Sequence, residues 1–474
     1  MNQIELTMGL LIAAIPLIGI ARRWGIPYPV ALVVGGLALG FVPGLPRITL
    51  DPNLVLLFFL PPLLYWESVT APTDEMRANG RWIWPLAIGL VLATTAIVAF
   101  AAHALVPGMA WATAFVLGAI VAPTDELATV PIAERLGVPR AIVAIIDGES
   151  LLNDAASLVL YAVAVAAVVT GTFALPHASF QFVIAGSGGC LIGLAAGFFA
   201  VVAWRAFRDT RLQTIVSVLL PFVAYLPAQR FGLSGVLAVV TAGVYVNRYT
   251  PEILTPSTRL TVTGWWETTV FLVNAIVYLL VGLTLHSVLD AALLHSTWTQ
   301  LALVALSVNV VIIGVRFAWI FGQARVPGLR RTSSGNPLDV KGLVVLGFGG
   351  LRGAVSLAAA LAIPLTTMSG ARFPNRELII LTTFSVIVVT LVGGGLGLPA
   401  IIGALRIPVD DTEENEVRTG LRALSAAGAA RLDQLLADGR VDERGAKVLR
   451  ERYCDLERLA QPAGDAEERH SRRQ

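Results

Sequence analysis

Thirteen long apolar stretches occupy most of the first 407 residues of this 474-residue chain, separated by charged or Pro/Gly-rich residues. A helix that crosses a bilayer needs about 20 mostly apolar residues. The stretches therefore predict an all-α polytopic membrane protein with about 13 transmembrane helices. The predicted spans are 3–21, 27–43, 52–70, 82–106, 109–134, 140–170, 178–204, 211–229, 232–247, 261–286, 297–324, 339–366 and 376–405.

Charge is scarce in the chain and collects at its end. Charged residues make up 14% of the sequence, against roughly 25% in an average soluble domain. Residues 408–474 alone hold 12 basic and 15 acidic side chains. We therefore expect a membrane domain over 1–407 and a cytoplasmic tail over 408–474. The net charge of +2 gives no reason to expect a nucleic-acid partner.

The tail has apolar residues at helical spacing on both sides of Asp438 and Gly439, which predict a turn between two helices. A helical hairpin of this kind is either a regulatory or dimer-supporting element or a solvated appendage. The sequence leaves both open.

The basic residues of the loops indicate an orientation. With the N-terminus outside, alternation along the spans puts fifteen Arg or Lys in cytoplasmic loops and four in outer loops. The excess on one side agrees with the positive-inside rule. We expect a multi-pass protein of the inner (plasma) membrane, with its C-terminus in the cytoplasm. The four outer residues are Arg47, Arg230, Arg372 and Arg376.

Thirteen spans divide into six, one and six, which permits two inverted repeats. The fifth span of the first half carries Pro123 and Pro131 around residues 124–126, and that of the second half carries four glycines around Arg352. Transporters built from inverted repeats place their site where corresponding helices of the two halves are broken near midplane. We therefore expect two broken helices that cross near the membrane midplane.

The sixth predicted span has one polar side. At 100° per residue its polar side chains share one face, and Leu, Val and Ala fill most of the other. An acidic residue at the bilayer centre costs about 2.5 to 3.5 kcal/mol, so such residues usually mark an ion path. Carboxylate, hydroxyl and amide oxygens suit hard cations. The polar residues are Asp147, Glu149, Ser150, Asn153, Asp154, Ser157 and Tyr161.

Arg352 supplies a positive charge within the membrane and needs a partner there. Glu149 is the natural one, which would leave Asp154, helped by Asp125, free to exchange its counter-ion. A small cation or a proton would satisfy the remaining negative charge. The five histidines show no ligand spacing, so we expect neither a transition-metal site nor a cofactor.

These residues resemble a known family. The run from Gly148 to Asp154, Thr124–Asp125, Phe59 to Pro62, and Leu351 to Leu357 occur in the expected order and spans. Together they are similar to the monovalent cation:proton antiporter-1 family of sodium/proton exchangers, in its bacterial branch. The resemblance covers about residues 5 to 405.

The resemblance implies a transporter, and not an enzyme, that exchanges a monovalent cation, with Na⁺ as first candidate, for H⁺. It implies a homodimer with a dimerisation domain and a six-helix core. It implies that cation and proton compete for Asp154, with Asp125, Ser150 and the Thr124 backbone completing the Na⁺ shell. Three further residues would shape the site, and the Asn among them suggests electroneutral exchange. These residues are Asn153, Glu149 and Arg352.

One residue departs from the family pattern. Many members have Pro directly after the Thr–Asp pair, where this chain has Glu126. The break can persist, because Pro123 still removes a backbone donor. The extra carboxylate is a candidate modulator of ion selectivity, pH response or stoichiometry.

Other functions stay open at this point. A K⁺/H⁺ exchanger or one of broad selectivity fits the same residues, because selectivity depends on cavity geometry. A cation channel would show a symmetric filter loop, which the sequence lacks. An intramembrane enzyme is disfavoured because Ser150 has no nearby base and no cofactor motif precedes a helix.

Overall fold

The computed structural model describes residues 3–24, 28–41, 57–126, 129–171, 175–293, 297–327, 338–407, 412–438, 440 and 442–459. Over these residues the chain consists of helices and turns, with one isolated antiparallel bridge between Thr366 and Arg372. The chain divides into two compact units, Met1–Ile407 and Pro408–Gln474.

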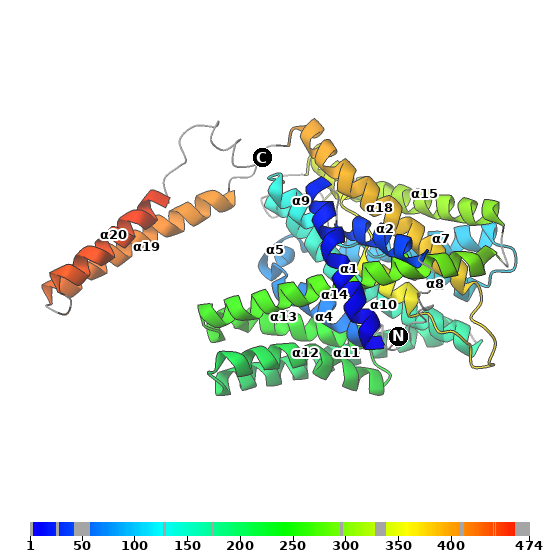
Figure 1. Cartoon of the computed structure of the whole chain (residues 1–474), viewed down its shortest axis with the longest axis horizontal. Coiled ribbons are helices and arrows are strands. Elements are labelled where there is room, and N and C mark those ends of the chain that lie inside the picture. Colours follow the sequence, from blue (N-terminus) through cyan, green and yellow to red (C-terminus); the bar gives the residue numbers. More distant parts are fainter. Residues whose placement is uncertain are drawn as a thin grey trace. The chain divides into compact units, whose positions relative to one another are not determined.

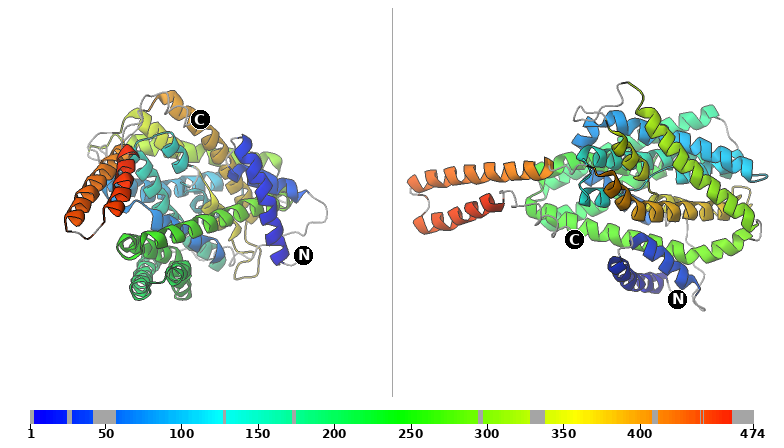
Figure 2. Two further views of the ribbon diagram at one scale, coloured as in Figure 1. Left: turned by 60° about the vertical axis from the view of Figure 1, so that its left-hand side comes forward. Right: turned by 90° about the horizontal axis from the view of Figure 1, so that it is seen from above.

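The first unit is a bundle of helices that pack side by side (Figures 1 and 2). In chain order its elements are α1 (Gln3–Trp24), α2 (Tyr28–Gly40), α4 (Leu60–Thr70), α5 (Thr73–Ala78), α6 (Gly80–Trp84), the π-helix η1 (Pro85–Leu90), α7 (Val91–Leu105), α8 (Trp111–Val121), α9 (Thr129–Arg135), α10 (Arg140–Thr170), α11 (Leu175–Ala206), α12 (Thr210–Arg230), α13 (Gly235–Ile253), α14 (Pro256–Leu293), α15 (Trp298–Gln323), α16 (Val340–Phe348), α17 (Ala354–Leu361) and α18 (Arg376–Leu405).

Within the described ranges, seven helical stretches are long and apolar enough to cross a membrane, judged by length and composition. The prediction of an all-α membrane fold is confirmed at this level. Residues 52–56 of the predicted third span lie outside the described residues. The seven stretches are Gly80–Leu105, Arg140–Thr170, Val183–Ala206, Thr210–Arg230, Pro256–Leu285, Trp298–Gln323 and Arg376–Leu405.

Two of the predicted spans are each split into two short helices. The stretch 109–134 forms α8 and α9, and the stretch 339–366 forms α16 and α17. Pro123 cannot donate a backbone hydrogen bond, which explains why α8 stops just before it. Glycines separate α16 from α17, and glycine is a weak helix former. Both helices are interrupted where the sequence predicted.

The long helix α14 packs against α2 with their backbones in contact. A Cβ built on Gly36 would lie 2.3 Å from the carbonyl oxygen of Leu279, and one built on Gly282 would lie 2.1 Å from that of Val33. No real side chain tolerates such distances, so glycine is required on both helices. The contact fixes the position of α14 relative to α2.

The second unit is a helical hairpin of α19 (Thr412–Ala437) and α20 (Glu443–Leu459), which run antiparallel (Figure 2). The Ser425 hydroxyl donates to the Tyr453 carbonyl oxygen at 2.9 Å. A hydrogen bond to Asp433 raises the pKa of Arg450, but both side chains are exposed and such pairs add little stability. Gly439 of the predicted turn lies outside the described residues.

Candidate functional site

The two interruptions lie directly against each other. The Asp125 N–H donates to the Leu351 carbonyl oxygen at 2.8 Å, and the Ala354 N–H donates to Asp125 Oδ2 at 3.1 Å. A Cβ on Gly353 would lie 1.3 Å from the same Oδ2. The Asp125 carboxylate therefore lies at the N-terminus of α17, where unpaired N–H groups and the helix dipole favour a negative charge.

Arg352, in the interruption between α16 and α17, contacts the C-terminus of α8. Its Nε–H donates to the Val121 carbonyl oxygen at 3.2 Å, at the last residue of α8. Its guanidinium also donates to the Gly350 carbonyl oxygen, and its backbone N–H donates to Thr390 Oγ1 at 3.1 Å. The positive side chain thus stabilises the C-terminus of α8, where carbonyl groups are unpaired.

Three polar residues of α10 hold the first interruption through Thr124. The Ser150 hydroxyl donates to the Thr124 carbonyl oxygen at 2.7 Å. The Asn153 amide donates to Thr124 Oγ1 at 2.8 Å. The Thr124 hydroxyl in turn donates to Glu149 Oε1 at 3.4 Å. The predicted polar side of α10 therefore faces the non-helical segment between α8 and α9.

Glu149 forms a buried ion pair with Arg316 of α15. Arg316 Nη1 lies 2.5 Å from Glu149 Oε1 and Nη2 lies 3.0 Å from Oε2. The side chains are 1% and 2% exposed. Arg316 Nη2 also donates to the Leu346 carbonyl oxygen at 2.8 Å, at the end of α16. The guanidinium thus joins α10, α15 and α16.

The predicted pairing of Glu149 with Arg352 is therefore wrong. Arg352 is occupied by backbone carbonyl groups at the interruptions, whereas α15 brings Arg316 within hydrogen-bond distance of both oxygens of Glu149. Sequence reasoning missed Arg316. The sequence could have pointed to Arg316, because it is the single charged residue inside the predicted span 297–324.

Asp154 is buried, with 3% of its surface exposed. No ion pair in the described part of the chain involves it, and two further acids, Glu67 and Asp125, lie within electrostatic range of it. Glu67 of α4 was not predicted as a site residue. It is 6% exposed, and its Oε2 has no hydrogen-bond partner among the described residues. Its sequence signal was a lone charge within the apolar stretch 52–70.

Glu126 has another acid of α10 as its partner. Its carboxyl group hydrogen-bonds that of Asp147 near the start of α10. Its Oε2 is buried and has no partner among the described residues. Through its contact with Asp147, Glu126 links the first interruption to the start of α10.

Three of the predicted cation ligands are engaged in hydrogen bonds within the protein. Among the described residues, no three His, Cys, Asp or Glu side chains converge closely enough to hold a metal ion. Asp125 lies at the N-terminus of α17, and the Ser150 hydroxyl is bonded to the Thr124 carbonyl group. The structure brings Thr124, Ser150 and Glu149 together.

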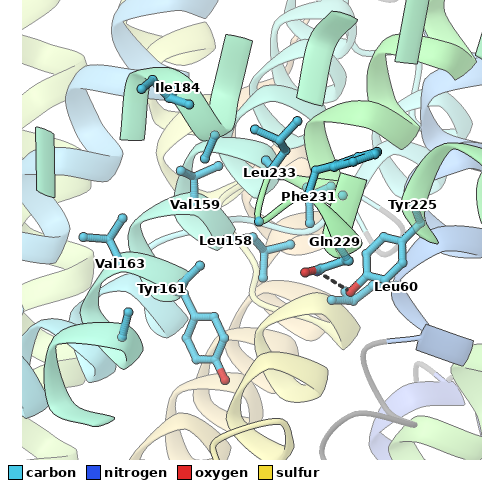
Figure 3. A pocket seen from close by; sticks show the side chains of 17 residues that line it. Leu60, Leu158, Val159, Tyr161, Val163, Ile184, Tyr225, Gln229, Phe231 and Leu233 are labelled. Atoms are coloured by element: carbon cyan, nitrogen blue, oxygen red, sulfur yellow. Dashed lines mark hydrogen bonds between the residues drawn. The ribbon is translucent and has the colours of Figure 1, made fainter. Parts of the chain in front are cut away.

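A cavity of about 570 Å³ lies beside the C-terminal half of α10, beyond Asp154. Leu158 and Tyr161 are four and seven residues beyond Asp154, so they share its face of the helix. Figure 3 shows them with Leu233, Phe231 and other apolar side chains around the cavity. The Gln229 amide donates to the Tyr225 hydroxyl at 2.9 Å on one wall.

Residues 9–403 match the family described as sodium/hydrogen exchanger, transmembrane. This range is well over half of the chain. The chain belongs to this family. The exchanger is 36% identical over 424 residues to an uncharacterised Na⁺/H⁺ exchanger of Mycobacterium tuberculosis, which covers 88% of this chain and 76% of that protein. It is 31% identical over 425 residues to a sodium, potassium, lithium and rubidium/H⁺ antiporter of Bacillus subtilis, covering 84% of this chain and 61% of that protein.

The fold of the exchanger is also similar to a solved structure. The sodium proton antiporter of Methanocaldococcus jannaschii superposes with a TM-score of 0.68 over 85% of this chain and 99% of that one, at 17% sequence identity. The family resemblance inferred from the sequence motifs is confirmed. The family match ends at residue 403, before the second unit begins.

Proposed function

We propose that this exchanger is a secondary active transporter that moves a monovalent cation, Na⁺ first among the candidates, against H⁺. The observation that carries the proposal is the environment of Asp154. It is a buried carboxylate in a membrane family of exchangers, it has no ion pair among the described residues, and the acids Glu67 and Asp125 lie within electrostatic range of it. The buried arginines are bound elsewhere, so a cation or a proton has to neutralise it.

Competition for one carboxylate produces exchange. Burial disfavours the charged form of a carboxyl group, and either a proton or a monovalent cation restores neutrality. Only a neutralised site crosses the low-dielectric interior at low cost. Because one ion must leave before the other binds, the two transport directions are coupled. One cation per proton makes the exchange electroneutral.

Four residues would supply the cation ligands in this proposal: Asp154, Asp125, Ser150 and the Thr124 carbonyl group. Ser150 and Thr124 are hydrogen-bonded to each other, so both oxygens would turn towards the ion when it binds. Asn153, with Glu149, Arg316 and Arg352, would hold the surrounding backbone. Glu126 would act as a modulator through its pair with Asp147.

We further propose the architecture in which this site works. The first unit would form thirteen spans in two inverted halves, with the two interruptions near the bilayer midplane. Contact between these interruptions and their matching positions in a six-one-six arrangement support this layout. A homodimer in the plasma membrane, with the N-terminus outside and the C-terminus cytoplasmic, agrees with the distribution of arginines.

The test is proton movement in proteoliposomes that carry a preset pH gradient, recorded as Na⁺, K⁺ or Li⁺ is added. We expect the cation to collapse the gradient, and we expect Asp154→Asn to abolish this response while the protein is still made and inserted. Glu267→Gln, which alters an exposed acid of α14, serves as the matched control and should transport normally. Normal exchange by Asp154→Asn would overturn the assignment.

A broad cation selectivity is the second candidate. It is favoured by the Bacillus subtilis relative, whose name gives sodium, potassium, lithium and rubidium. The same assay decides between the two. Comparable half-maximal concentrations for Na⁺ and K⁺ would indicate broad selectivity, whereas a response to Na⁺ and Li⁺ alone would indicate a sodium exchanger.

A further inference from the structure

A tyrosine from outside the two broken helices meets the Asp125 carboxylate. Tyr278 lies on α14 and is 1% exposed. Its hydroxyl lies close to the Asp125 side chain and to the Ala354 backbone, the two groups it can hydrogen-bond. Since the Ala354 N–H also donates to Asp125 Oδ2, the phenol, the carboxylate and the first amide of α17 form one cluster.

The place of this hydroxyl is set by rigid packing. Tyr278 is followed one residue later by Leu279 and one helical turn later by Gly282, and both of these touch the backbone of α2. The backbones of α2 and α14 cannot slide or rotate here without steric overlap. Tyr278 therefore presents its hydroxyl from a fixed surface, independent of the non-helical segment that carries Asp125.

We propose that Tyr278 is a positioning residue, whose hydroxyl holds the Asp125 carboxylate in the orientation that Asp125 needs for cation binding. The inference rests on the proposed function. Asp125 follows α8 in a non-helical segment, so its own backbone does little to fix its side chain. Two donors from separate elements, the Ala354 amide and the Tyr278 hydroxyl, select one orientation, and hydrogen bonds to a charged acceptor are the stronger ones.

The test is Tyr278→Phe, which removes one oxygen atom and leaves the ring. We expect the cation concentration for half-maximal collapse of the pH gradient to rise about tenfold, as for the loss of about 1.4 kcal/mol from a hydrogen bond to a charged group. The maximal rate should stay as in the wild type, because the hydroxyl does not touch the ion. Tyr278→His, which keeps a ring donor, should recover part of the affinity.

Two tyrosines serve as matched controls. Tyr65→Phe removes another fully buried hydroxyl, bonded to Ser217 at 3.1 Å, and Tyr28→Phe removes one that lies within electrostatic range of Asp125. Both should leave the half-maximal concentration unchanged. An unchanged or lower concentration in Tyr278→Phe, or an equal rise in Tyr65→Phe, would overturn the proposal.

A second measurement separates this inference from the proposed function. Melting temperatures of the purified full-length protein are compared for Tyr278→Phe, Asp125→Asn and the double variant. We expect the double variant to lose less than the sum of the single losses, because both substitutions remove the same bond. Additive losses would refute the positioning role. If the wild type shows no cation-driven proton movement, the proposed function fails, and this cycle still tests the contact.

Discussion

Arg316 and Arg352 each direct a buried guanidinium at backbone carbonyl groups where a helix ends. Arg316 reaches Leu346 in the last turn of α16, and Arg352 reaches Val121 at the end of α8. The last carbonyl groups of a helix lack partners within it and carry the negative end of its dipole. A guanidinium has five donors, so Arg316 can bind these carbonyl groups and Glu149 together.

The first residue-scale prediction concerns this ion pair. Arg316→Ala should lower the free energy of unfolding by about 3–5 kcal/mol, because it leaves Glu149 as an unpaired buried charge. The measurement is the thermal melting of the purified protein in detergent. Arg325→Ala, which removes an exposed arginine just beyond the end of α15, is the control and should melt like the wild type. Equal melting of both variants would contradict the role of Arg316.

The limits of sequence reasoning are visible at the same residues. Glu149, Ser150 and Asn153 could be placed on one side of α10, because 100° per residue fixes directions within a single helix. Whether Arg316 or Arg352 reaches Glu149 depends on how distant helices cross, and local periodicity carries no information on that. Glu67 was missed for the same reason, since a lone acid gains meaning only when its neighbours are known.

At the scale of elements, each broken helix supplies a charged side chain that binds unpaired backbone groups of the other. Asp125 from the first interruption accepts from the N-terminus of α17, and Arg352 from the second donates to the C-terminus of α8. The Thr129 hydroxyl of α9 also donates to the Gly349 carbonyl oxygen at 3.1 Å. An interruption exposes unpaired backbone groups inside the membrane, where each costs several kcal/mol. The two interruptions are thus tolerated because they satisfy each other.

Gly353→Ala tests this contact between elements. The new Cβ would lie 1.3 Å from Asp125 Oδ2, so the carboxylate has to leave the N-terminus of α17. We expect loss of cation-driven proton movement together with a lower melting temperature. Gly403→Ala, at a glycine of α18 with no atom within 4 Å of a new Cβ, should behave like the wild type. Normal transport by Gly353→Ala would show that the interruptions need no close contact.

The elements themselves were largely predictable. Proline and glycine beside ionisable residues located both interruptions, because these residues weaken a helix wherever they occur. The number of membrane spans was harder to predict from the sequence. Within the described part of the predicted third span, helix α4 covers Leu60–Thr70, and whether a helix of this length counts as a span depends on where the bilayer lies. Hydropathy alone does not include that information.

At the scale of the whole molecule, the proposed site lies in the first unit, whereas a large share of the charged residues lies in the second. Every residue proposed for the site lies within Met1–Ile407, and the family match ends within that unit. The tail contains 27 of the 66 formal charges of the chain. Its hairpin is held by α19–α20 contacts such as the Ser425–Tyr453 hydrogen bond. The site therefore depends for its internal hydrogen bonds and ion pair on the first unit alone.

The final prediction follows from this division. A chain truncated after Ile407 should still collapse a pH gradient when Na⁺ is added, because the acids, both buried arginines and the two interruptions are all retained. The measurement is the rate of collapse at several pH values for the truncated and full-length proteins, at matched amounts in the vesicle. Equal pH profiles would identify the hairpin as an appendage, whereas a displaced profile with an intact maximal rate would assign it a regulatory role. Loss of exchange at normal protein level would contradict the prediction, because the first unit would then need the tail to work.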